Sequence, residues 1–129
     1  MAALRDVVVD CRHPASLARW WAATLDGYRV APYDEAELAR LRAEGIEDPE
    51  DDPTVLVEPA GAPTGPRIWF QRVPEPKTVK NRVHLDLTVP DLAAGVANLV
   101  ARGAAVVAEH DGWTVLADPE GDEFCVFPA

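Results

Sequence analysis

One order of secondary-structure signals occurs twice along the chain, and this repeat restricts the fold more than any other feature. Residues 6–11 and 82–89 are rich in β-branched and apolar residues and predict strands. A helical pattern follows each of them and ends at a glycine, Gly27 in the first half and Gly103 in the second. Three further strand signals come next in both halves. Matching positions are offset by about 76 residues, which is the sign of an internal repeat.

The second half has the simpler pattern, because the first half carries an acidic insertion. A short amphipathic helix and a proline-broken acidic loop separate the second and third strand signals of the first half. We treat this acidic loop as solvated surface. In the first half we expect helices at 12–28 and 34–46, a loop at 47–53, strands at 28–31, 54–59 and 67–73, and a turn at 60–66. In the second half we expect a helix at 91–103 and strands at 105–109, 113–117 and 123–127.

A βαβββ unit of this size cannot bury both faces of its sheet, so two such units are expected to pack together and enclose a concave surface. Module one covers about residues 1–73 and module two about residues 82–129, with a polar joint at 74–81. The length of 129 residues is typical of a single domain.

Composition excludes several classes of function. The 12 basic and 22 acidic residues give a net charge of −10, which disfavours binding to nucleic acids. No apolar run approaches the roughly 20 residues that cross a membrane, and the N-terminus lacks the features of a signal peptide. We therefore expect a cytoplasmic protein with no membrane partner. Cys11 and Cys125 form no CxxC motif and are expected to be reduced.

Three stretches resemble the vicinal-oxygen-chelate superfamily, which includes glyoxalase I, bleomycin-resistance proteins and extradiol dioxygenases. They are VVVDCRHPASLARWWAATLDGY, IWFQRVPEPKTVKNRVHLDL and LADPEGDEFCVF, and the match is nearest to the bacterial glyoxalase-like branch. The last stretch carries Asp122 where the family commonly has Asn. The resemblance implies an α+β fold, in which two tandem βαβββ modules form a curved mixed sheet around a cleft, and it implies a homodimer.

The resemblance also implies four metal-ligand positions, which fall on Asp6, Gln71, His84 and Cys125. Only His84 is the residue that the family usually has there. A mixed set of nitrogen, oxygen and sulfur ligands would suit zinc, and nickel, iron or manganese are also possible. Because the set depends on a neutral amide and on a cysteine in place of a carboxylate, we expect that no metal is required. His84 would then be a polar residue in a metal-free pocket, with Asp86 as its partner.

Side chains alternate along strands, so the candidates on each strand can share one face. The predicted cleft residues are Trp69, Gln71, His84, Asp86, Trp113 and Cys125. The two tryptophans suit a flat apolar ligand but could instead belong to the core. The basic residues Lys77, Lys80 and Arg82 could attract an anion, although a solvated linker explains them more simply. His13 and His110 are expected at the surface without a role.

Three hypotheses for the function follow. The first is a protein that binds a small aromatic or oxygenated ligand and has a degenerate metal site. The second is a metal-dependent lyase, isomerase or dioxygenase that acts on vicinal oxygens, with Asp6 or Glu123 as the group that moves a proton. The third is an interaction module without a small ligand.

Overall fold

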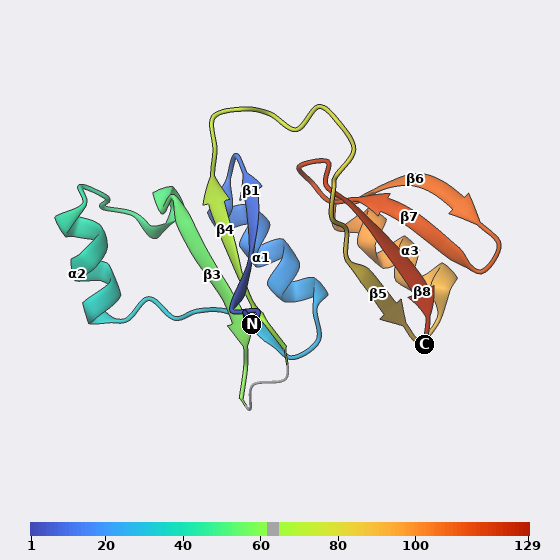
Figure 1. Ribbon diagram of the computed structural model, residues 1–129, viewed down its shortest axis with the longest axis horizontal. Coiled ribbons are helices and arrows are strands. Elements are labelled where there is room, and N and C mark those ends of the chain that lie inside the picture. Colours follow the sequence, from blue (N-terminus) through green and yellow to red (C-terminus); the bar gives the residue numbers. More distant parts are fainter. Residues whose placement is uncertain (62–64) are drawn as a thin grey trace. The chain divides into compact units, whose positions relative to one another are not determined.

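The computed structural model describes residues 1–61 and 65–129, which form two compact units, Met1–Pro76 and Lys77–Ala129. Each unit contains one mixed four-stranded sheet and a helix packed against it (Figure 1). The predicted α+β class and the two tandem βαβββ modules are therefore confirmed. The predicted turn at 60–66 includes residues 62–64, which lie outside the described residues. That the two units make one domain around a cleft stays a prediction.

The first unit has the strand order β1-β4-β3-β2, with β1 parallel to β4 and the other pairs antiparallel. The predicted insertion is present between β2 and β3. The elements are β1 (Asp6–Cys11), α1 (Pro14–Thr24), β2 (Tyr28–Val30), α2 (Glu35–Ala43), the 3₁₀ helix η1 (Pro49–Asp51), β3 (Thr54–Pro59) and β4 (Arg67–Arg72).

Helix α1 covers one face of this sheet and leaves the other open. Pro14 begins the helix, where a missing N–H costs nothing because it would have no partner inside the helix. Trp20 and Trp21 are buried and meet edge to face, with ring centroids 5.1 Å apart. The alternating residues Ile68 and Phe70 of β4 are buried as well, so Trp69 between them belongs to the open face.

The acidic loop is less solvated than its composition predicts. Asp52 is only 1% exposed, although it belongs to the run that we expected at the surface. Glu50 accepts two hydrogen bonds from the Arg19 guanidinium, at 2.7 and 2.9 Å, and so ties the loop to α1. The expectation was wrong for Asp52 because its partners lie outside the loop.

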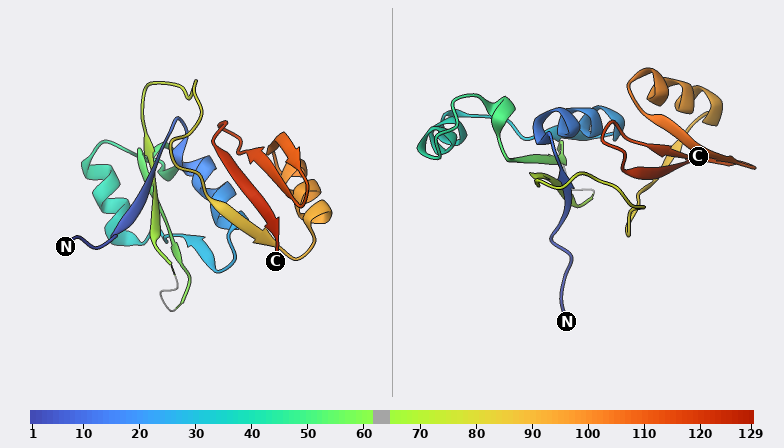
Figure 2. Two further views of the ribbon diagram at one scale, coloured as in Figure 1. Left: turned by 45° about the vertical axis from the view of Figure 1, so that its right-hand side comes forward. Right: turned by 90° about the horizontal axis from the view of Figure 1, so that it is seen from above.

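The second unit repeats the arrangement, with the strand order β5-β8-β7-β6 and β5 parallel to β8. Helix α3 lies over one face of this sheet (Figure 2, right). Its Gly95 has a structural reason, because a Cβ there would lie 2.8 Å from a methyl carbon of Val89. The elements are β5 (Asp86–Val89), α3 (Leu92–Ala101), β6 (Ala105–His110), β7 (Trp113–Ala117) and β8 (Glu123–Pro128).

Strand β5 is shorter than predicted, since it begins at Asp86 and not at residue 82. His84 therefore lies just before the strand. The neighbouring Leu85 carbonyl still accepts a hydrogen bond from the Cys125 N–H at 2.9 Å, which keeps this segment against β8. Helix α3 also begins later than predicted, at Leu92, after Asp91 has capped it by accepting the Ala94 N–H at 2.8 Å.

Candidate functional site

A pocket of about 220 Å³ lies on the face of the second sheet opposite the buried residues Phe124 and Val126. We call it the second-sheet pocket. It brings together five residues that the sequence analysis selected, which are His84, Asp86, Trp113, Glu123 and Cys125. Its other lining residues are Lys80, Val115 and Phe127.

Aromatic rings form a row across three strands at this pocket. Trp113 of β7 stacks with His110 of β6, with ring centroids 4.1 Å apart and planes 14° apart. On its other neighbouring strand, Trp113 stacks with Phe127 of β8 at 5.4 Å and 10°. Because Trp113 and Phe127 both line the pocket, this part of its wall is apolar.

Three possible metal ligands meet at one corner of the second-sheet pocket. The ligand atoms of His84, Asp86 and Cys125 all lie within 4.8 Å of one another. The register of the parallel pair places Asp86 beside Cys125, and His84 Nε2 lies 3.3 Å from Asp86 Oδ1. Burial, together with the charge of the Asp86 carboxylate and a hydrogen bond to it, raises the pKa of the Cys125 thiol. Without a metal, this thiol is therefore protonated at neutral pH.

Glu123 is held as a carboxylate at the pocket wall. It accepts hydrogen bonds from the Lys77 ammonium at 3.1 Å and from the Asn81 N–H at 3.0 Å. Burial raises the pKa of Glu123, but these hydrogen bonds and the Lys77 charge outweigh it and lower the pKa to about 2. A carboxylate with so low a pKa is a weak base.

The other predicted residues belong to the first unit. Asp6 accepts two hydrogen bonds from the Arg67 guanidinium, at 2.8 and 2.9 Å, and a third from Trp69 Nε1 at 3.2 Å. The Arg67 contact is the largest influence on Asp6 and lowers the pKa of its carboxyl group. Gln71 lies between Asp10 and Thr54 in the strand register and is exposed. The set of Asp6, Gln71, His84 and Cys125 as ligands of one metal stays a prediction.

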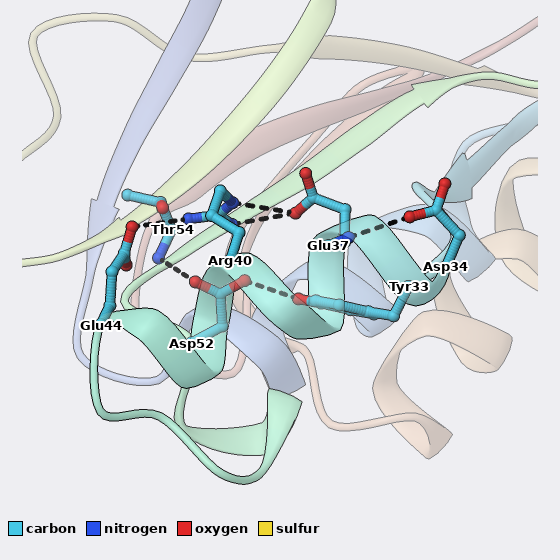
Figure 3. A network of polar contacts seen from close by, with 7 residues as sticks. All are labelled: Tyr33, Asp34, Glu37, Arg40, Glu44, Asp52 and Thr54. Atoms are coloured by element: carbon cyan, nitrogen blue, oxygen red, sulfur yellow. Dashed lines mark hydrogen bonds and ion pairs between the residues drawn. The ribbon is translucent and has the colours of Figure 1, made fainter.

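The first unit has a pocket of its own, of about 260 Å³, between α2 and the open face of its sheet. Trp69, Leu56 and Thr54 come from the sheet, and Arg40 comes from α2. The Arg40 guanidinium is already engaged, because it donates to Glu37 at 2.9 Å and to Glu44 at 3.1 Å (Figure 3).

The buried Asp52 carboxylate is one of the residues that line this pocket. Asp52 accepts the Tyr33 hydroxyl hydrogen at 2.8 Å and the Thr54 N–H at 3.0 Å (Figure 3). Burial is the largest of the influences that raise the pKa of Tyr33, and the hydrogen bond to Asp52 adds to it. The Tyr33 hydroxyl is therefore a fixed donor with a structural role.

Phe127 and Val115 line the second-sheet pocket and were not selected from the sequence, while Lys80 was considered only as one of three basic residues. Phe127 could have been found, because it alternates with Cys125 on one strand. His110 was expected to have no role, yet it extends the aromatic row. Its signal was the tight turn between β6 and β7, which sets it opposite Trp113. Lys80 had no local signal that separates it from Lys77 and Arg82.

Comparison with known proteins supports the fold. A structure of a glyoxalase/bleomycin resistance protein/dioxygenase family enzyme from Burkholderia phytofirmans is 17% identical, with a TM-score of 0.64 and 98% of each chain covered. A fosfomycin resistance protein from Mesorhizobium loti is 10% identical, with a TM-score of 0.66, covering 98% of this chain and 91% of that one. A superfamily member from Sphaerobacter thermophilus is 16% identical, with a TM-score of 0.59, and coverage is 100% and 98%.

A search of curated proteins finds no match. Among the described residues, no helix is long and apolar enough to cross a membrane. The family comparison is decisive, because the glyoxalase-like domain matches residues 6–127, which is almost the whole chain. The resemblance to the vicinal-oxygen-chelate superfamily is thereby confirmed, and the chain belongs to the glyoxalase-like domain family.

Proposed function

We propose that this protein binds a small, flat molecule in the second-sheet pocket and needs no metal to do so. The observation that carries this proposal is the row of near-parallel rings formed by His110, Trp113 and Phe127. A flat ligand can extend such a row by stacking on the ring at its end, and stacked aromatic pairs contribute about 0.5–1.5 kcal/mol beyond their buried area.

The size of the pocket limits the ligand. About 220 Å³ lies below the 300–1,000 Å³ or so that is usual for drug-sized ligands. A ligand with one ring or two fused rings therefore fits the proposal best. The structural relatives named for bleomycin and fosfomycin resistance give general support, because those names refer to small molecules.

Binding of naphthalene derivatives, followed by thermal shift and isothermal titration calorimetry, tests the proposal. Ligands that bind only the native state raise the melting temperature. We expect Trp113→Ala to weaken binding by about tenfold, since removing an aromatic anchor commonly costs more than 1 kcal/mol. Val107→Ala is the matched control, because Val107 lies on β6, is 55% exposed and does not line the pocket. If Trp113→Ala leaves the binding affinity unchanged, this pocket is not the binding site. If no compound of a broad panel binds, the result favours an interaction module without a small ligand.

A metal-dependent lyase, isomerase or dioxygenase is the second candidate. The cluster of His84, Asp86 and Cys125 favours it, because three ligands and an open position make a catalytic metal site. Imidazole, carboxylate and thiolate together fit a borderline divalent cation such as zinc. A metal held there would polarise vicinal oxygens of a substrate as a Lewis acid.

The two carboxylates that were predicted to transfer a proton in such an enzyme are poorly suited to that role. Glu123 and Asp6, the predicted groups for proton transfer, both accept strong hydrogen bonds from cations, and the pKa of each is lowered. In our proposal these carboxylates are structural, and they orient the 77–81 segment and Trp69 respectively. We also propose that the protein is a cytoplasmic homodimer in which both cysteines are reduced.

A further inference from the structure

We infer that the second-sheet pocket selects flat aromatic ligands that carry an anionic group, and that Lys80 is the residue that recognises this group. The inference rests on the proposed function of the same pocket and names its class of ligand. An aromatic carboxylate is the simplest compound of this class.

The two acidic residues of the pocket, Glu123 and Asp86, differ in their partners. Glu123 accepts hydrogen bonds from Lys77 and Asn81 and is only 14% exposed. Asp86 lies beside His84 and the Cys125 thiol at the other corner. Glu123 is therefore not available as a ready partner for a ligand cation, whereas the Asp86 side chain is 59% exposed and has only the His84 imidazole and the Cys125 thiol beside it.

The three basic residues of the 77–82 segment also differ in their contacts. Lys77 is paired with Glu123, and its side chain is 21% exposed. Arg82 donates to the Lys80 carbonyl oxygen at 3.3 Å and does not line the pocket. Lys80 lines the pocket, and its ammonium forms no ion pair with any residue that the structure describes.

The Lys80 charge borders the same pocket as the apolar side chains. Lys80 and Cys125 both line the second-sheet pocket. Cys125 and Phe127 alternate on β8 and therefore point to the same face of the sheet. Lys80, Cys125 and the aromatic rings of Trp113 and Phe127 thus line one pocket. A flat ring beside Phe127 would bring a carboxylate on its rim towards Lys80. A charge-assisted hydrogen bond would then form at little cost, because no internal ion pair must break first.

Three probes with one ring system test the inference, namely 2-naphthoate, 2-naphthamide and 2-naphthylmethylammonium. We expect the wild-type protein to bind the naphthoate about 5-fold more tightly than the amide, which is typical for one partly solvated charged contact. The ammonium compound should bind most weakly. Lys80→Met should reduce the affinity for naphthoate to that for the amide and leave the amide affinity unchanged. Lys80→Arg should restore the preference.

Arg82→Met is the matched control, because it removes one positive charge from the same segment without touching the pocket. If Arg82→Met reduces naphthoate binding as much as Lys80→Met does, the preference comes from general charge and Lys80 loses its assignment. Equal binding of naphthoate and naphthamide to the wild type overturns the anion preference alone and leaves the proposed function standing. If none of the three probes binds, the proposed function fails together with the inference.

Discussion

Asp52 is a residue whose role depends on one distant partner, Tyr33, and one neighbour, Thr54. Its two oxygens accept hydrogen bonds from the Tyr33 hydroxyl and the Thr54 N–H, and the residue is almost fully buried. Because Tyr33 precedes α2 and Thr54 begins β3, this one carboxylate joins the two ends of the insertion. The first-unit pocket depends on that connection.

Replacing Asp52 should therefore destabilise the protein. Asp52→Ala leaves two donors without their acceptor, and we expect the free energy of unfolding to fall by about 1–3 kcal/mol. Urea denaturation measures this change. Asp51→Ala is the control, because its neighbouring side chain is exposed and the substitution should change stability little. Equal effects of the two substitutions would show that Asp52 contributes nothing beyond the acidic loop as a whole.

At the scale of elements, the turn between β7 and β8 contains a pair of carboxyl groups in contact. Asp118 is 3% exposed and accepts the N–H groups of Glu120 and Asp122 at 2.9 and 3.1 Å. Asp122, which replaces the family's common Asn, hydrogen-bonds Asp118 through its own carboxyl group. An Asn side chain could donate to Asp118 at any pH, whereas Asp122 can donate only while it is protonated.

This pair should make stability depend on pH. Burial, and then the Asp118 charge, raise the pKa of Asp122 from 3.8 to about 7. The Lys77 charge lowers this pKa and the Glu120 charge raises it further. The folded protein therefore binds a proton that the unfolded chain has lost between about pH 4 and pH 7, so stability falls as the pH rises through this range. Solvent screening limits the loss to about 1–2 kcal/mol.

Asp122→Asn tests this prediction by supplying a permanent donor. We expect the variant to lack this fall and to melt at a higher temperature than the wild type at pH 8. The melting temperature is measured from pH 5 to pH 8, with Asp111→Asn in the exposed β6–β7 turn as the control. If the melting temperatures of the wild type and of Asp122→Asn change with pH in the same way, Asp122 does not hold this proton in the folded protein.

The elements themselves were largely predictable, because glycines, prolines and periodic apolar residues are local signals. Gly103 shows why, since its φ of 112° favours glycine and ends α3 where the pattern predicts. The start of β5 and the burial of Asp52 were not predictable, because both depend on pairing with distant segments. For the site, alternation could place Cys125 and Phe127 on one face. It could not distinguish Lys77, which pairs with Glu123, from Lys80, for which the described part of the chain offers no ion pair.

At the scale of the whole molecule, the two units use the same register for different side chains. In the first unit the parallel strands pair Asp10 with Gln71, and in the second they pair Asp86 with Cys125. The repeat relates His84 to Val8, which is 53% exposed and cannot bind a metal. The His84 imidazole and the Cys125 thiol therefore have no counterpart at the matched positions of the first unit, which hold Val8 and Gln71.

This asymmetry predicts which residues hold an added metal. We expect titrated Co²⁺ to give the absorption of a cobalt–thiolate bond, and we expect His84→Ala or Cys125→Ser to abolish that absorption. Gln71→Ala and Asp6→Asn should leave it unchanged, because the Asp6 carboxylate is held by Arg67 and Trp69. Circular dichroism checks that each variant is folded. Loss of the absorption in Gln71→Ala or Asp6→Asn would instead support the set of four ligands that the family resemblance implies. No uptake by the wild-type protein would eliminate the metal-dependent candidate and leave the metal-free pocket, in which the Cys125 thiol remains protonated beside Asp86.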